Sequence, residues 1–170
     1  MMKENVYTER MPSMEKSSPL YFPLFVDLSE KRILVIGGGK IAQRRIETLL
    51  DFAADICVVA PEITDKLRIL SESRRIQWIQ DVYHTNLTEG ADIVLAATNS
   101  SSCNDQIAAD CKARKIPVNT AHKKESCDFY FPGIVRQGNI VTGISTSGLN
   151  HHEAKEARER ISQALGTRQI

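Results

Sequence analysis

The stretch from Arg32 to Ala42 places the strongest constraint on what this chain can fold into. Residues 33–36 form a short apolar block, mostly β-branched, which is typical of an interior parallel strand covered on both faces. Three glycines follow, and an amphipathic pattern then begins, with its apolar residues on one helical face: Ala42, Ile46, Leu49 and Leu50. The stretch therefore predicts a buried strand, a glycine turn and a helix that ends near Phe52.

The glycine turn matches the pattern G-x-G-x-x-A, in which each small residue has its own task. Gly37 allows a tight turn, Gly39 lets the backbone approach a ligand closely, and Ala42 lets the helix pack on the strand. Lys40 and Ile41 open the helix, whose free N–H groups and positive dipole end would face a pyrophosphate. The pattern alone also fits a plain structural turn, but the flanking strand and helix favour dinucleotide binding.

The composition argues against several other classes of protein. A chain of 170 residues, of which 42% are hydrophobic, can bury the core of one domain with at most a small appendage. Its formal net charge of +1 argues against a general nucleic-acid or membrane-surface binder, which needs a basic excess. Residues 1–18 have no apolar core, and no apolar run could span a bilayer, so we expect neither a signal peptide nor a membrane segment.

Four cysteines show no C-x-x-C spacing, and two of them lie inside apolar patterns. Disulfides and structural zinc sites both need paired cysteines. We therefore expect free thiols in a reducing cytoplasm: Cys57, Cys103, Cys111 and Cys127.

Strand and helix patterns alternate along the middle of the chain. After the first strand and helix, further strands are expected at residues 55–60, 76–80, 91–97 and 115–119. Further helices are expected at residues 63–75 and from Ser101 or Ser102 onward, since serine is a good N-cap. This alternation implies right-handed crossovers and predicts an α/β fold with a Rossmann-like parallel sheet.

Outside this alternation the chain follows other patterns. Residues 20–26 are apolar but contain Pro23, which predicts an extended segment or an edge strand. Residues 129–135 and 140–145 flank a longer turn and predict an antiparallel hairpin, which needs a packing partner in the sheet or in another chain. A helix is expected at residues 153–165. We divide the chain into a flexible tail (1–18), a Rossmann domain (19–119), a hairpin segment (120–148) and a C-terminal helical segment (149–170).

Six short motifs occur in an order that is specific to one known family. They are Phe22-Pro23-Leu24-Phe25, Val58-Val59-Ala60-Pro61, Ala97-Thr98-Asn99, Val118-Asn119, Cys127-Asp128-Phe129-Tyr130-Phe131-Pro132 and Ile144-Ser145-Thr146-Ser147-Gly148. From about Leu20 to Arg160, the chain resembles the N-terminal part of siroheme synthases. Stand-alone members are called precorrin-2 dehydrogenases, and some also act as sirohydrochlorin ferrochelatases.

The resemblance implies NAD-dependent oxidation of precorrin-2, a tetrapyrrole, to sirohydrochlorin in siroheme biosynthesis, with iron insertion as a second reaction in some members. It also implies a homodimer joined through the region of the hairpin. The nicotinamide would lie past the carboxyl ends of the strands near Thr98 and Asn99, at the switch point of the sheet. Next to Pro61, Glu62 is the acid expected to accept the ribose hydroxyls, and the lack of an adjacent Lys or Arg favours NAD over NADP.

The chain departs from the family's pattern at the expected acid/base. After Val-Asn the family carries an aspartate, and here His122 takes that position, whereas Asp128 belongs to a separate motif. A neutral imidazole can accept a proton near pH 7, so His122 is the candidate base. The alternative is a solvated turn histidine beside Lys123 and Lys124.

A second departure follows Gly148, where the family often shows Ser-Pro and this chain has Asn150-His151-His152. Imidazoles bind iron, but adjacent helical residues do not face one way, so we expect a helix start and no metal ligand there. The longer helical C-terminal part of the family is mostly missing before Ile170, so the sequence does not say how the macrocycle would be enclosed.

Five cations could pair with the carboxylates of the macrocycle, although each fits a solvated position equally well: Lys123, Lys124, Arg136, Lys155 and Arg158.

Two other functions also fit the sequence. The first is a non-catalytic module that binds a dinucleotide or a tetrapyrrole as a sensor, a carrier or an assembly partner. The replaced aspartate and the short C-terminal part favour it. The second is a chelatase without dehydrogenase activity. We expect the NAD-dependent dehydrogenase, because the dinucleotide half of the pattern is intact.

Overall fold

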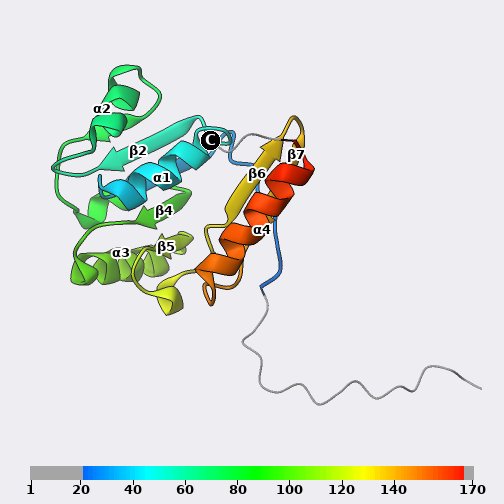
Figure 1. Cartoon of the computed structure of the whole chain (residues 1–170). Coiled ribbons are helices and arrows are strands. Elements are labelled where there is room, and N and C mark those ends of the chain that lie inside the picture. Colours follow the sequence, from blue (N-terminus) through cyan, green and yellow to red (C-terminus); the bar gives the residue numbers. More distant parts are fainter. Residues whose placement is uncertain (1–20, 167–170) are drawn as a thin grey trace, which may run out of the picture.

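The computed structural model describes residues 21–166, which form a layered α/β unit with a smaller hairpin-and-helix unit beside it (Figure 1). The main sheet contains five strands, all parallel, in the order β3-β2-β1-β4-β5. These strands are β1 (Arg32–Ile36), β2 (Asp55–Val59), β3 (Gln77–Ile79), β4 (Ile93–Ala96) and β5 (Val118–Thr120). The connections contain the helices α1 (Lys40–Leu49), α2 (Asp65–Glu72) and α3 (Ser101–Arg114), with a short helical turn, η1 (Thr85–Thr88), before β4. This arrangement confirms the predicted Rossmann-like sheet.

Two apolar clusters cover the two faces of the sheet. On one face α1 and α2 contribute residues such as Ile46 and Leu67, which pack with Val35 of β1. On the other face α3 contributes Ile107, which packs with Leu34 of β1. Because both faces are covered, every residue from 33 to 36 is at most 2% exposed. This burial explains the continuous apolar run in the sequence.

The switch point of the sheet lies between β1 and β4. From β1 the chain moves outward to β2 and β3, and it then returns to the other side of β1 to form β4 and β5. The registers pair Val35 with Leu95 and Leu95 with Asn119, so the carboxyl ends of β1, β4 and β5 lie at one edge of the sheet. In α/β sheets of this kind, ligands bind in the crevice at this position.

The smaller unit contains β6 (Gly133–Gln137), β7 (Ile140–Ile144) and α4 (His151–Ala164). Its antiparallel hairpin confirms the prediction, but the predicted longer turn is wrong. Gln137 pairs with Ile140, so the turn has only two residues, Gly138 and Asn139. Gly138 has a φ of +56°, which the first position of such a tight turn requires.

A connection of residues 127–132 explains why β6 starts at Gly133 rather than at residue 129. This connection lies along β5, where Asp128 accepts a hydrogen bond from the Val118 amide at 2.9 Å and donates its own amide to the Val118 carbonyl at 2.8 Å. The Asn119 side chain donates to the Phe129 carbonyl at 2.7 Å. Phe129 packs against the core on the α1 face, so these residues cover the edge of β5 instead of forming a hairpin strand.

Other local expectations had mixed outcomes. Residues 21–26 form no strand, so the edge-strand alternative is wrong for these residues. The N-cap of α3 is Ser100, whose Oγ accepts from the Cys103 amide at 3.2 Å, rather than Ser101 or Ser102. The helix start at His151 is confirmed, with Asn150 as its cap. All four cysteines are free, as predicted.

The predicted tail at residues 1–18 lies outside the described residues. Within residues 21–166, no helix has both the length and the apolar character that crossing a membrane requires.

Candidate functional site

The glycine turn after β1 is tied to both neighbouring strands. The Gly37 amide donates to the Val59 carbonyl of β2 at 2.9 Å. Gly37 has a φ of +118°, and a Cβ at this position would lie 2.3 Å from the carbonyl oxygen of Ala97, at the end of β4. Only glycine fits such a conformation and such a contact, so Gly37 brings the turn against both strand ends.

Gly38 has a packing role that sequence analysis did not assign. A Cβ at Gly38 would lie 2.2 Å from the Glu62 carbonyl oxygen, and the Gly38 carbonyl accepts from the Thr64 amide at 3.0 Å. The turn therefore packs tightly against the start of the β2–α2 connection. The only signal in the sequence is that three glycines stand in a row where the pattern requires two.

Gly39 faces open space, in contrast to its two neighbours. It is the N-cap of α1, it has an ordinary φ of −83°, and it makes no side-chain capping bond. A Cβ at Gly39 would meet nothing within 4 Å. Lys40 is exposed and Ile41 is 47% exposed beside it, whereas Ala42 is fully buried against the sheet. This open cradle at a helix N-terminus fits the pyrophosphate of a dinucleotide, because the N–H groups of the first turn and the helix dipole both favour an anion there.

Pro61 and Glu62 border the same turn on the β2 side. Both residues are exposed, and the Pro61 carbonyl accepts from the Gln80 side chain at 3.2 Å. The Glu62 backbone lies against Gly38, so this exposed residue follows β2 directly beside the glycine turn. This is the position at which the ribose of a bound dinucleotide is expected.

Thr98 and Asn99 follow β4 on the other side of the turn, and a buried asparagine fixes the first of them. Asn104 of α3 is 1% exposed; its Oδ1 accepts from the Thr98 amide at 3.1 Å and from the Thr98 hydroxyl at 2.8 Å. Its Nδ2 donates to the Thr98 carbonyl at 3.0 Å. Asn99 is exposed next to this fixed point. Sequence analysis missed Asn104, although a polar residue three positions before Ile107 on the apolar face of α3 is a signal.

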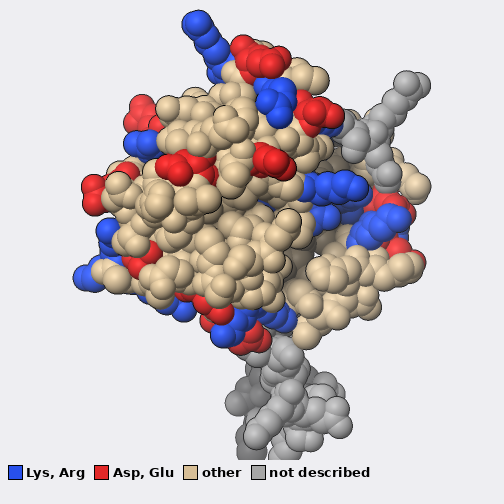
Figure 2. Space-filling model, turned by 90° about the vertical axis from the view of Figure 1, so that its left-hand side faces the viewer, with Lys and Arg blue, Asp and Glu red and all other residues tan. Residues whose placement is uncertain are grey.

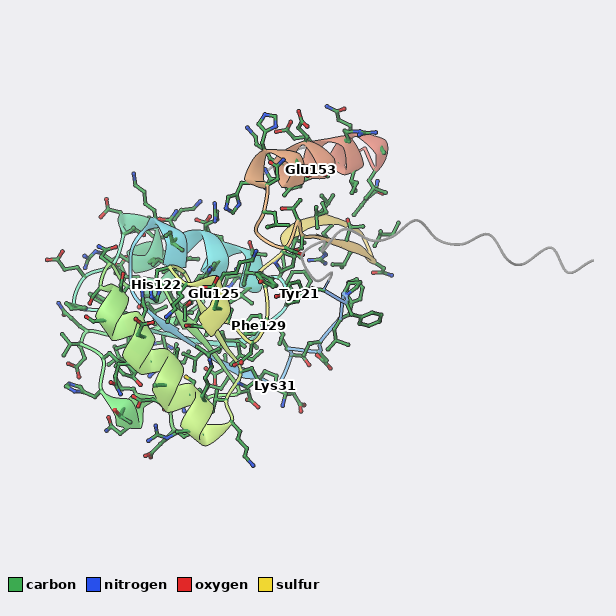
Figure 3. All side chains as sticks on the ribbon, turned by 90° about the horizontal axis from the view of Figure 1, so that it is seen from below. Tyr21, Lys31, His122, Glu125, Phe129 and Glu153 are labelled. Atoms are coloured by element: carbon green, nitrogen blue, oxygen red, sulfur yellow. The ribbon has the colours of Figure 1, made fainter. Side chains whose placement is uncertain are left out.

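His122 lies just beyond β5, in a loop that runs beside the end of β4. The Ala121 amide donates to the Ala96 carbonyl at 2.9 Å, which joins this loop to β4. The His122 side chain is only 22% exposed, and its Nε2 lies 3.3 Å from Oδ1 of Asp105 on α3. Figure 3 shows His122 close to α3 and far from Glu153 on α4. The residue as a whole is exposed, as the solvated-turn alternative expects, but its side chain contacts Asp105, a partner that the sequence analysis did not identify.

The loop of His122 is held by contacts at both of its ends. The Thr120 hydroxyl donates to the Lys123 carbonyl at 2.7 Å, and the Cys127 Sγ accepts from the Thr120 amide at 3.2 Å. Lys124, in the turn η2 (Lys124–Ser126), lies 5.8 Å from the ring centroid of Tyr130. These contacts give the imidazole a defined backbone position.

The five candidate cations for the macrocycle are not gathered in one place. Lys123 and Lys124 lie in the His122 loop, but Arg136 pairs with Asp51 at 3.5 Å, just past the C-terminal end of α1. Lys155 pairs with Glu159 within α4 at 3.8 Å, and Arg158 lies on the same helix, against Gly133 of β6. The face onto which the strands end is mostly free of charged side chains at its centre, with charges of both signs around it (Figure 2).

Comparison with known proteins places this geometry in a family. A family model described as putative NAD(P)-binding matches residues 24–133. Over 143 residues the chain is 31% identical to precorrin-2 dehydrogenase of Bacillus subtilis (strain 168), and the match covers 84% of this chain and 88% of that protein. The chain belongs to the precorrin-2 dehydrogenase family. Within this family, the solved structure of "SirC, precorrin-2 dehydrogenase" is 25% identical, with a TM-score of 0.73, and the match covers 85% of this chain and 71% of that one.

Longer relatives contain the same region as one part of a larger protein. The chain is 38% identical over 162 residues to a probable multifunctional siroheme biosynthesis protein, HemA, of Ruminiclostridium josui, and the match covers 94% of this chain and 31% of that protein. The chain thus spans about a third of the length of these siroheme relatives. In this precorrin-2 dehydrogenase family member, the NAD(P)-binding match runs from the segment before β1 to the start of β6.

The contrast between Gly38 and Gly39 provides a matched test of the cradle. Gly39→Ala should keep the free energy of unfolding within about 1 kcal/mol of wild type, because its methyl group has space, but should weaken NAD⁺ binding about tenfold or more by filling the cradle. Gly38→Ala should lose about 1–3 kcal/mol of stability, because its methyl group meets backbone. Urea unfolding and calorimetric titration with NAD⁺ measure the two effects. Wild-type NAD⁺ affinity in folded Gly39→Ala would contradict this assignment.

Proposed function

We propose that this protein oxidises precorrin-2 to sirohydrochlorin with NAD⁺ as the hydride acceptor. The observation that carries the proposal is the order of features along one edge of the sheet. The open Gly39 cradle follows β1, the fixed Thr98 follows β4, and His122 follows β5, so a nucleotide site and a candidate base lie next to each other. The relative from Bacillus subtilis, of which the chain covers 88%, is a precorrin-2 dehydrogenase, which supports the choice of substrate.

The residues of the cradle have separate binding roles in this proposal. The turn from Gly37 to Ala42 holds the pyrophosphate, and Glu62 accepts hydrogen bonds from the ribose hydroxyls. Neither Lys nor Arg occurs from residue 56 to 65, around the end of β2, so a 2′-phosphate would find no cation there and NAD is preferred over NADP. Thr98 and Asn99 border the nicotinamide, and Asn104 keeps Thr98 in place.

The reaction removes one hydride and one proton from the reduced macrocycle. Bound NAD⁺ supplies the hydride acceptor and leaves as NADH. The neutral imidazole of His122 accepts the proton and later releases it to solvent, so that precorrin-2 and NAD⁺ give sirohydrochlorin, NADH and H⁺. Lys123 and Lys124, in the same loop, are the cations that we assign to the carboxylates of the macrocycle. The reaction takes place in the cytoplasm, where the four free cysteines stay reduced.

We also propose that the active form is a homodimer. Five neighbouring apolar side chains are largely exposed in the single chain: Tyr21 (54%), Phe22 (87%), Leu24 (76%), Phe25 (72%) and Val26 (57%). Tyr21 packs edge-to-face on Tyr130, with ring centroids 4.4 Å apart, which joins this patch to the connection before β6. The hairpin itself has only two strands and exposes Ile140 at 51%. A second copy of the chain would cover both surfaces, as patches of this kind usually require.

Anaerobic incubation of the purified protein with precorrin-2 and NAD⁺ tests the proposed reaction. NADH and sirohydrochlorin should appear in the absorbance spectrum, and His122→Ala should lower kcat by about 10²- to 10⁴-fold because the general base is lost. His84→Ala, which removes a histidine that has a 57% exposed side chain and pairs with Asp81, should keep the wild-type rate. Normal NAD⁺ binding without oxidation would instead support the non-catalytic module. Metal insertion into sirohydrochlorin without NAD⁺ would support the chelatase.

Sedimentation velocity tests the proposed dimer. The wild-type protein should sediment as a dimer, and the double variant Phe22→Ser, Phe25→Ser should shift it toward the monomer by removing apolar area from the interface. Ile69→Ser, at a residue of α2 that is 63% exposed, should leave the dimer intact. A monomeric wild-type protein at micromolar concentration, or an unchanged dimer in the double variant, would contradict the assignment of this patch.

A further inference from the structure

The His122 imidazole has a carboxylate partner from a different element. Its Nε2 lies 3.3 Å from Oδ1 of Asp105, and the two side chains are 22% and 51% exposed, respectively. His122 comes from the loop after β5, whereas Asp105 comes from the second turn of α3. The chain therefore brings an acid to the base across two neighbouring connections of the sheet.

Both partners are held by their surroundings, so the contact has a defined geometry. Asp105 follows Asn104, which is locked by its hydrogen bonds to Thr98, and Ser100 caps the same helix. On the other side, the Thr120 hydroxyl bonds to the Lys123 carbonyl and Cys127 closes the loop. The backbone positions of His122 and Asp105 are thus set by bonds that neither side chain makes.

Other charged groups near the pair have different contacts. Lys124 lies over the ring of Tyr130 and packs against Gly148, and Lys123 and Glu125 are exposed beside it. On α3 the next acid, Asp110, accepts from the Tyr83 hydroxyl at 2.7 Å. Among the described residues, Asp105 is the acid found in ion-pair contact with His122.

The contact determines how the imidazole can act. When Asp105 accepts a hydrogen bond from Nε2–H, the neutral ring keeps its lone pair on Nδ1, which is then the atom that can take a proton. Once Nδ1 is protonated, the positive ring lies beside the Asp105 carboxylate, whose Oδ1 is 3.3 Å from Nε2. The imidazole of His122 would thus take the proton and the Asp105 carboxylate would lie beside the resulting charge. In the family, the resemblance implies that a single aspartate takes the proton.

We propose that Asp105 is a positioning residue for His122, which selects the tautomer that accepts the proton at Nδ1 and stabilises the resulting imidazolium. This proposal rests on the proposed function, in which His122 receives the proton from the macrocycle. It also accounts for a histidine at a place where the resemblance implies an aspartate, because the carboxylate is supplied from α3. Since Asp105 is half exposed, its effect on the rate should be modest, about 3- to 5-fold.

The first experiment reads the tautomer without turnover. Nitrogen NMR of the ¹⁵N-histidine-labelled protein, with the His122 signals assigned by their loss in His122→Ala, should show a neutral His122 that carries its proton on Nε2. Asp105→Asn keeps an acceptor oxygen and should preserve this tautomer, whereas Asp105→Ala should give a mixture. Asp55→Ala, at an exposed residue at the opposite end of the sheet, is the matched control and should leave the signals unchanged. A proton on Nδ1 in the wild type, or no change in Asp105→Ala, would overturn the proposal.

The second experiment measures the effect of the Asp105 charge on turnover of precorrin-2. In Asp105→Asn, which keeps an acceptor oxygen but loses the negative charge, kcat should fall about 3- to 5-fold at an unchanged KM. A kcat equal to wild type would overturn the role of Asp105 while the proposed function stands. If the wild type shows no turnover, the proposed function fails, and the tautomer still decides whether Asp105 holds His122.

Discussion

The close approach of the glycine turn to the two strands beside β1 is the contact on which the rest of the site depends. Gly37 lies where any Cβ would collide with the Ala97 carbonyl, and Gly38 lies equally close to the Glu62 carbonyl. Because both residues lack side chains, α1 can begin directly above the ends of β1 and β4. Gly39 then remains the only glycine of the turn with free space over it, at the N-terminus of α1. The packing of two glycines thus leaves open space at the third, where we propose that the dinucleotide binds.

Contacts along β5, at the edge of the sheet, position the loop that carries His122. Asp128 and Asn119 hold the connection to the hairpin against β5, and Phe129 anchors it in the core. This connection covers an edge strand that would otherwise be open, and it fixes the loop that carries His122. Two further contacts reach α1 and the residues just after it: Arg45 lies over the ring of Phe131 in the connection, and Arg136 of β6 pairs with Asp51. The cradle at Gly39 and the candidate base His122 are therefore positioned by separate sets of contacts, on opposite sides of β4.

The sequence was sufficient to predict the main sheet, because strands buried on both faces need continuous apolar runs and helices need one apolar face. It also located Gly37, Gly39, Thr98 and His122 at strand ends. Residues whose roles arise only from tertiary contacts could not be predicted in this way. Gly38 matters because Glu62 folds back on it, Asn104 because Thr98 turns toward it, and Asp105 because α3 starts beside the His122 loop. The predicted start of the hairpin, at residue 129, was wrong for the same reason. The bonds of Asp128 to Val118 hold the residues just before β6 against β5.

The central claim is that electrons leave precorrin-2 for a dinucleotide held in the Gly39 cradle. A single anaerobic turnover, with enzyme in excess over precorrin-2 and with saturating NAD⁺, tests this claim most directly. Absorbance records NADH and sirohydrochlorin in the same sample. The account predicts one NADH for each sirohydrochlorin formed, with the same rate constant for both signals. Sirohydrochlorin without an equal amount of NADH, or no change in either signal while NAD⁺ is bound, would contradict it.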